Sequence, residues 1–167
     1  MSQKLNIFIL IPILLLGFAL RLHNLDGVLL RGDEAFSAMF WAEMPISQSL
    51  SEIATIEPHP PLTYVTFHMW NLIIGGIDSP FALRMLDVLT NIIGIAAMYG
   101  IGKHLTGKPV VGLLSALLWA VHPFEIWHSQ DFRNYAVWAG LSAITLWLGL
   151  RLISYPQERN MKLYFVL

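Results

Sequence analysis

The chain has 167 residues, of which 56% are hydrophobic and 13% charged, whereas an ordinary soluble domain carries about 25% charged residues. Its formal net charge of −1 gives no sign of a polyanionic partner, so we expect no nucleic acid ligand. The absence of cysteine excludes a disulfide framework and a cysteine metal site.

The apolar residues form runs of about 20 residues, the length that crosses a membrane. The first run follows Lys4 and ends near Leu20, and small residues at Gly17–Ala19 leave open a cleaved signal peptide. Further runs follow, so we predict an all-α, multi-pass protein integral to the cell membrane. About four spans are expected, over residues 5–22, 83–102, 109–127 and 135–153. The hydrophobic tail predicts that the chain is truncated before a fifth span.

Residues 23–80 are predicted to form a long outer loop that carries short helices along the membrane surface. Asp33 can cap a helix that runs to about Met44. Ser49–Glu52 has the form of a capping box at the start of a second helix. Pro61 can open a third helix, which Gly75 and Gly76 would end.

The third helix, within residues 61–77, could either cross the membrane or lie at its surface. The distribution of basic residues decides between these two alternatives, because cytoplasmic loops are enriched in Lys and Arg. If the helix does not cross, six of the ten basic residues lie inside: Lys4, Lys103, Lys108, Arg151, Arg159 and Lys162. If it crosses, the inside keeps only Lys4, Arg84 and Arg133. We therefore predict an interfacial helix and a cytoplasmic N-terminus, which places most of the chemically capable residues outside.

Two acids begin the outer loop. Asp33 and Glu34 could simply cap a helix and complement its dipole. Alternatively, a carboxylate at this boundary could act as a general base towards an attacking hydroxyl. Farther along, Glu57 and His59 stand two residues apart in a proline-rich stretch. That stretch could be a structural turn, or its two side chains could hold a divalent metal ion.

Two further groups of charged residues lie at the outer ends of predicted spans. Arg84 could snorkel to the interface, neutralise a phosphate or hold an acidic group. Asp131 and Arg133 could be a solvated pair, or the opposite wall of a cleft that begins at Asp33.

The order of these elements resembles the N-terminal part of the membrane-embedded C-type (GT-C) glycosyltransferases. The similarity is greatest to the protein O-mannosyltransferases and their aminoarabinose-transferase relatives, and it covers about residues 5–153. The stretches that carry it are DE at residues 33–34, HPPL at 59–62, FALR at 81–84 and HSQDFRNYA at 128–136.

This resemblance implies that a sugar passes from a polyprenyl-phosphate carrier to an acceptor hydroxyl on the non-cytoplasmic face. The acceptor would be a protein, a lipid or a glycan, and no nucleotide cofactor is implied. The site residues carried over are catalytic Asp33 and Glu34, substrate-binding Arg84, Asp131, Arg133 and Tyr135, and metal-binding His59 with Glu57.

Members of this group have more spans than the present chain. Residues 1–167 are therefore expected to be the N-terminal portion of such an enzyme, which would need a missing C-terminal half or a partner chain for activity. The alternative is a non-catalytic membrane protein, such as a piece of a transporter or an assembly subunit. A transporter would place paired ionisable groups and broken spans near the membrane midplane.

Overall fold

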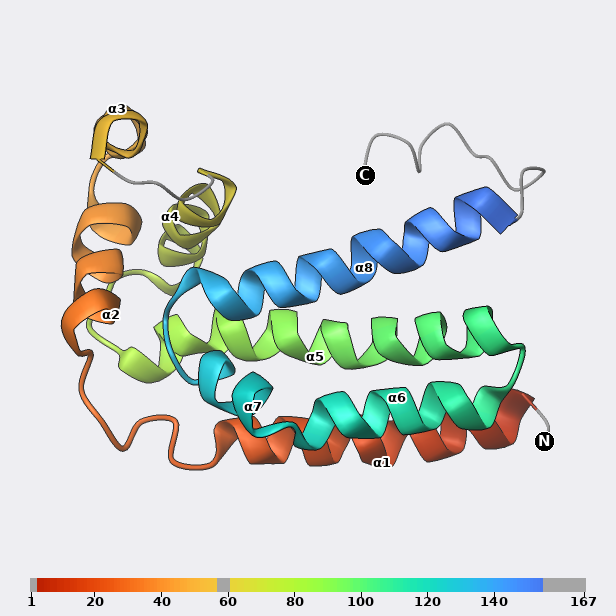
Figure 1. The fold of residues 1–167 in the computed structure, drawn as a ribbon. Coiled ribbons are helices and arrows are strands. Elements are labelled where there is room, and N and C mark those ends of the chain that lie inside the picture. Colours follow the sequence, from red (N-terminus) through yellow and green to blue (C-terminus); the bar gives the residue numbers. More distant parts are fainter. Residues whose placement is uncertain (1–2, 57–60, 155–167) are drawn as a thin grey trace.

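The computed structural model of the chain describes residues 3–56 and 61–154, and every regular element in these ranges is a helix (Figure 1). The predicted all-α class is therefore confirmed. The elements are α1 (Gln3–Leu22), α2 (Gly32–Phe36), the π-helix η1 (Ser37–Glu43), α3 (Ile46–Ile56), α4 (Leu62–Ile74), α5 (Pro80–Thr106), α6 (Pro109–Val121), α7 (Pro123–Ser129) and α8 (Asn134–Ser154).

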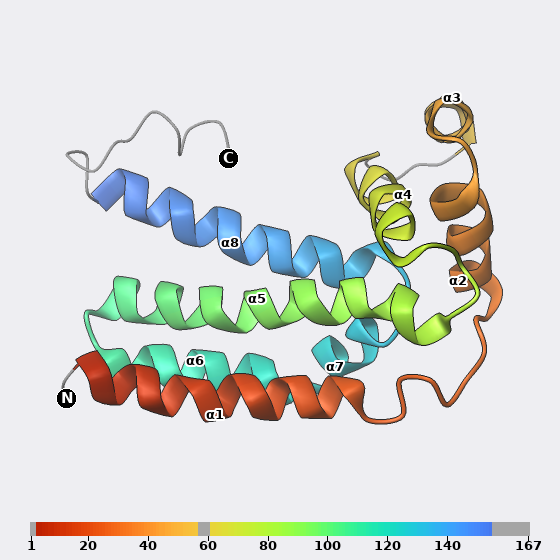
Figure 2. The same ribbon diagram turned by 180° about the vertical axis from the view of Figure 1, so that it is seen from behind.

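Four helices, α1, α5, α6 and α8, lie side by side, with α5 in the centre (Figures 1 and 2). By length and composition, α1, α5 and α8 are each able to cross a membrane. Helices α6 and α7 together could form a fourth, broken span. A multi-pass membrane protein is thus confirmed, with three helices among the described residues, or four if the bent pair is one span, that are long and apolar enough to cross.

The bend between α6 and α7 corrects the continuous span expected over residues 109–127. The two helices meet at 56°. Pro123 has no backbone N–H, and its ring restricts the preceding residue to extended conformations. His122 accordingly has φ −67° and ψ 121°, which ends α6 and starts α7 in a new direction.

Small residues allow α5 to approach its neighbours closely. Gly140 of α8 faces the carbonyl of Thr90, and Gly112 of α6 faces the carbonyl of Tyr99, so a Cβ atom at either glycine would overlap the α5 backbone. Close approach at glycine is a usual way to pack helices in a membrane, where lipid removes the hydrophobic drive for association.

Helices α2, η1, α3 and α4 stand together at one end of the bundle (Figure 1). Helix α4 has 13 residues, about 20 Å at 1.5 Å per residue, too short for the roughly 30 Å hydrocarbon core. It begins after Pro61 and ends at Gly75, whose φ of 81° gives the expected left-handed cap. These features agree with the predicted short helix that does not cross.

Two predicted helix starts are wrong. The first helix starts at Gly32 because the N–H of Glu34 donates to the carbonyl of Arg31, so Asp33 lies in the first turn and is not the cap. The helix α3 starts at Ile46, and Ser49 lies inside it, with its hydroxyl donating to the carbonyl of Phe40 at 3.2 Å. In both places a nearby backbone acceptor closes the helical turn before the predicted capping residue.

An aromatic core holds the outer helices against the bundle. Trp41 of η1 packs on Tyr64 of α4, with ring centroids 4.8 Å apart. Phe67 of α4 stacks on Phe132, which follows α7, at 4.1 Å. All four rings are buried. This core brings the segment between α1 and α5 against the segment between α7 and α8, and the candidate site lies beside it.

Candidate active site

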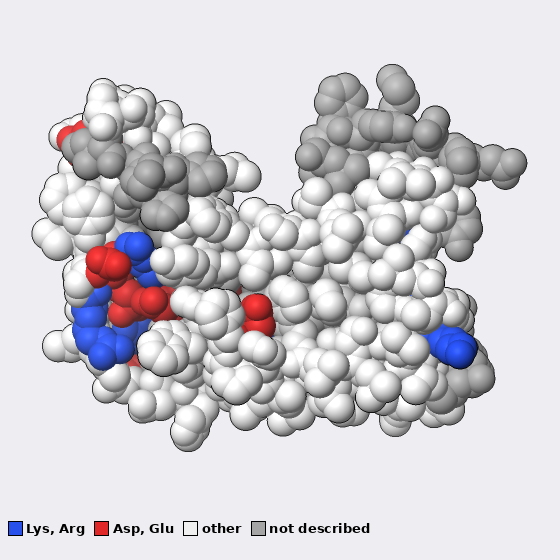
Figure 3. Space-filling model, viewed as in Figure 1, with Lys and Arg blue, Asp and Glu red and all other residues white. Residues whose placement is uncertain are grey.

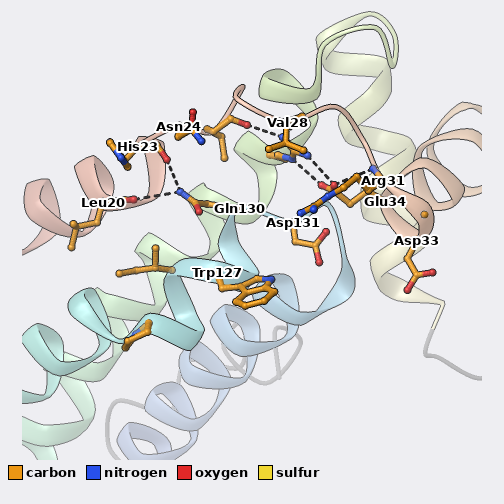
Figure 4. A pocket seen from close by; sticks show the side chains of 15 residues that line it. Leu20, His23, Asn24, Val28, Arg31, Asp33, Glu34, Trp127, Gln130 and Asp131 are labelled. Atoms are coloured by element: carbon orange, nitrogen blue, oxygen red, sulfur yellow. Dashed lines mark hydrogen bonds and ion pairs between the residues drawn. The ribbon is translucent and has the colours of Figure 1, made fainter.

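A cavity of about 1020 Å³ opens where α1, α2, α5 and α7 meet. Figure 3 shows the acidic and basic side chains of one face gathered mainly at the end of the bundle that carries α2. The polar residues lining the cavity are His23, Asn24, Arg31, Asp33, Glu34, Arg84, Gln130 and Asp131 (Figure 4). Leu20, Leu25, Val28, Pro123, Ile126 and Trp127 supply an apolar part of the wall. The cavity is therefore amphipathic.

A buried ion pair joins α2 to α5 behind this cavity. Arg84 Nε donates to Glu34 Oε1 and Arg84 Nη2 to Glu34 Oε2, each at 2.8 Å. The backbone N–H of Phe132 also donates to Glu34 Oε1, at 2.9 Å. Burial alone would raise the pKa of Glu34, but the hydrogen bonds from Arg84 and Phe132 outweigh it and lower the pKa. The charged Glu34 side chain therefore links α2 to α5 and to the segment between α7 and α8.

The remaining hydrogen bonds of Arg84 fasten the loop between α1 and α2. Its Nη1 donates to the carbonyls of Leu25 and Val28 at 2.8 and 2.9 Å. Only 4% of the Arg84 side chain is exposed. This geometry favours a supporting role for Arg84 over contact with a phosphate.

Asp131 lies in the cavity wall near this ion pair. Burial and the negative charge of Glu34 raise its pKa to about 6, and Arg133 and Arg84 oppose the rise. A hydrogen bond to Glu34 also favours the protonated form of Asp131. Asp131 therefore keeps its proton to a higher pH than a free aspartate, and carboxyl groups perturbed in this way are typical of acid–base sites.

Replacing Asp131 with asparagine is expected to make stability less dependent on pH. Because the folded pKa of about 6 exceeds the ordinary 3.8, Asp131 favours the folded state below pH 4 and loses that contribution as pH rises through 6. After allowance for solvent screening, we expect this effect to lower the unfolding free energy of the wild type by about 1 kcal/mol between pH 4 and 7, or roughly 2–4 °C in Tm. Thermal unfolding at pH 4 and 7 should therefore show a smaller decrease in Asp131→Asn than in the wild type. An equal decrease would show that Asp131 does not hold its proton in this way.

Asp33 and Arg133 meet at the edge of the cavity. Arg133 Nη2 lies 3.5 Å from Asp33 Oδ2, and the Asp33 side chain is 80% exposed. Figure 4 shows its carboxylate apart from those of Glu34 and Asp131. The cavity lining thus contains one buried acid, Glu34, one half-buried acid, Asp131, and one exposed acid, Asp33.

The other predicted site residues are placed differently. Tyr135 packs on His128, with ring centroids 4.6 Å apart, and among the described residues it lies outside the cavity lining. Glu57 and His59 lie outside the described residues. Within residues 3–56 and 61–154 no three His, Asp or Glu side chains are grouped to hold a metal ion. The predicted metal site thus depends on Glu57 and His59 and stays a prediction.

Sequence reasoning missed Gln130, which ties the cavity wall to α1. Its Nε2 donates to the carbonyl of His23 at 2.8 Å and to that of Arg21 at 3.1 Å, with Leu20 at 3.5 Å (Figure 4). These carbonyls belong to the end of α1, where helices leave acceptors unpaired. The stretch HSQDFRNYA contained Gln130, but nothing in its spacing indicated this partner.

Arg21 of α1 donates in turn to carbonyls at the end of α6. Its side chain is fully buried and donates to the carbonyls of Ala120 at 2.9 Å and Trp119 at 3.2 Å, at the end of α6. It also donates twice to Asn91 Oδ1, while Asn91 Nδ2 donates to Glu125 at 2.7 Å. The end of α1 and the bend between α6 and α7 therefore satisfy each other's free carbonyls.

One known family matches most of the chain. Residues 58–167 match the model of a family described as dolichyl-phosphate-mannose-protein mannosyltransferase. The chain belongs to this family. Neither the curated proteins nor the solved structures gave a match. The family agrees with the predicted GT-C resemblance, and the matched segment includes α4 to α8, which supply Arg84 and Asp131.

Proposed function

We propose that the chain takes part in transferring a sugar from a polyprenyl-phosphate carrier to an acceptor hydroxyl on the non-cytoplasmic membrane face. The observation that carries this proposal is the amphipathic cavity with acids of three different environments, in a chain of the mannosyltransferase family. A lipid-linked donor suits such a cavity, because its prenyl chain is apolar and its sugar phosphate is polar.

Asp33 is the general base in this proposal, as the resemblance implies. Its carboxylate stands at the cavity edge, where an acceptor arriving from the water side reaches it first. It would take the proton of the acceptor hydroxyl as the oxygen attacks the anomeric carbon and the polyprenyl phosphate leaves. Glu34, held by Arg84, fixes the first turn that carries Asp33. Fixed charges of this kind supply a large part of many rate enhancements.

The distribution of charge favours this enzyme over a transporter. Arg21 lies in the last turn of α1, and Arg84 and Asp87 lie near the start of α5, so these charges gather at the cavity end of the spans. Lys103 lies in the last turn of α5, at its other end. A transport path would instead need ionisable groups near the midplane.

Sealed membrane vesicles can test both the donor and the orientation. The vesicles come from cells that carry the chain at its native locus, and the probe is a labelled, water-soluble short-chain prenyl-phosphate mannose. Right-side-out vesicles should transfer the label to endogenous acceptors, and inverted vesicles should do so only after permeabilisation. Transfer by sealed inverted vesicles would refute the orientation. Absence of transfer even in permeabilised vesicles, or equal transfer from a nucleotide sugar without carrier, would refute the proposed reaction.

A further inference from the structure

We infer that the guanidinium of Arg31 binds the phosphate of the lipid-linked donor, an inference that rests on the proposed function. Arg31 directly precedes α2 and lines the cavity beside Glu34 (Figure 4). It is the only lysine or arginine in residues 23–80.

The other cations near the cavity are already engaged. Arg84 is buried, with four hydrogen bonds to Glu34, Leu25 and Val28. Arg133 is 17% exposed and is paired with Asp33. A phosphate bound by either arginine would have to compete with these carboxylate and carbonyl acceptors.

Arg31 has no such competitor. Its side chain is exposed to the cavity, and within the described part of the chain its guanidinium makes no hydrogen bond or ion pair. Its backbone is nevertheless fixed, because its carbonyl accepts from the N–H groups of Glu34 and Ala35 and its own N–H donates to Glu34 Oε2. A fixed backbone with a free guanidinium suits phosphate, which arginine can bind through two parallel hydrogen bonds.

The charge of the cavity wall favours a phosphate contact at Arg31. The lining includes two arginines, Arg31 and Arg84, and three acids, Asp33, Glu34 and Asp131, a formal sum of −1 when all are charged. Without Arg31 the sum would be −2, and an entering phosphate would meet repulsion with no free cation. The apolar wall near Leu25 and Val28 lies in the same cavity and offers a place for the prenyl chain.

The test compares binding of farnesyl phosphate and farnesol to the full chain in nanodiscs of neutral phosphatidylcholine. Wild-type protein should bind farnesyl phosphate more tightly than farnesol. Arg31→Gln should weaken farnesyl phosphate binding about tenfold or more, since hydrogen bonds to charged groups are among the strong ones, and should leave farnesol binding unchanged. The affinity of Arg31→Lys for farnesyl phosphate should lie between those of the wild type and Arg31→Gln. Arg151→Gln, which removes an exposed arginine in the last turn of α8, is the matched control and should bind like the wild type.

Phosphatidic acid and inorganic phosphate, tested as competitors, distinguish the sources of the phosphate. Neither should displace farnesyl phosphate at equal concentration. If phosphatidic acid binds as tightly and with the same dependence on Arg31, the site is one for membrane headgroups and the inference is overturned. It is also overturned, with the proposed function intact, if Arg31→Gln binds farnesyl phosphate like the wild type. If the wild type does not prefer farnesyl phosphate to farnesol, both the inference and the lipid-phosphate donor fall.

Discussion

Replacing Asp33 with asparagine is expected to lower sugar transfer by about two orders of magnitude or more, with normal expression and membrane insertion. An amide cannot accept the acceptor's proton, and general-base assistance is typically worth ~10²–10⁴ in rate. The effect on folding should be small, because Asp33 is 80% exposed and lies in a first helical turn, where a negative charge contributes about 0.3–1 kcal/mol. The measurement is transfer from the prenyl-phosphate donor in membranes carrying each variant at the native locus.

Two variants make this result interpretable. Asp78→Asn makes the same chemical change at an exposed residue between α4 and α5, and should leave transfer unchanged. Asp131→Asn tests the other candidate base. If Asp33→Asn keeps near-normal turnover while Asp131→Asn abolishes it, the base lies on the second outer loop. In that case kcat/KM in the wild type should rise with pH through about 6, the pKa of Asp131.

Glu34→Gln should be severely destabilising, although the resemblance alone predicts only a mild effect on transfer. The substitution leaves the guanidinium of Arg84 buried without a counter-charge. Removing one partner of a buried pair costs about 3–5 kcal/mol. For a chain of this size we expect Tm in detergent to fall by roughly 10 °C or more. Glu52→Gln, at a partly exposed acid of α3, should stay within about 0.5 kcal/mol of the wild type.

A double-mutant cycle distinguishes the stability that comes from the Glu34–Arg84 ion pair from the stability that each residue contributes separately. If the ion pair itself is responsible, Arg84→Met should cost much less in the Glu34→Gln background than in the wild type, since no buried charge then remains unpaired. Additive losses from the two substitutions would contradict this explanation and would assign the stability to the separate bonds with Phe132, Leu25 and Val28.

The spans could be predicted from the sequence because composition and length are enough to specify a helix that crosses a membrane. Helices α1, α5 and α8 fall close to their predicted places. The bend at Pro123 was also predictable, because a proline late in an apolar run restricts the residue before it. The prediction of one continuous span over residues 109–127 did not take this proline into account.

The site was only partly predictable, because its contacts join residues far apart in the chain. Glu34 and Arg84 are separated by 50 positions, and Glu34 and Phe132 by 98. Local rules assigned a capping role to Asp33, but the tertiary pairing of Glu34 sets where the first turn begins. The free state of Arg31 likewise becomes visible only once the partners of Arg84 and Arg133 are known.

The contact between Arg21 and α6 has a consequence for synthesis of the chain. Arg21 and its acceptor Ala120 are 99 positions apart, so α1 emerges from the ribosome long before its partner exists. At about 5–20 residues per second, that interval lasts roughly 5–20 s. Of the acceptors described for Arg21 in the folded chain, only the carbonyl of Gly17, on the same helix, is present before α5 is made. A guanidinium so poorly paired would be costly inside lipid, and the side chain must extend to the water at the membrane surface. Arg21 lies one position from the end of α1, where that reach is shortest. The first helix can thus enter the bilayer early and bury its charge only when α5 and α6 have arrived, so the cavity is completed late in insertion.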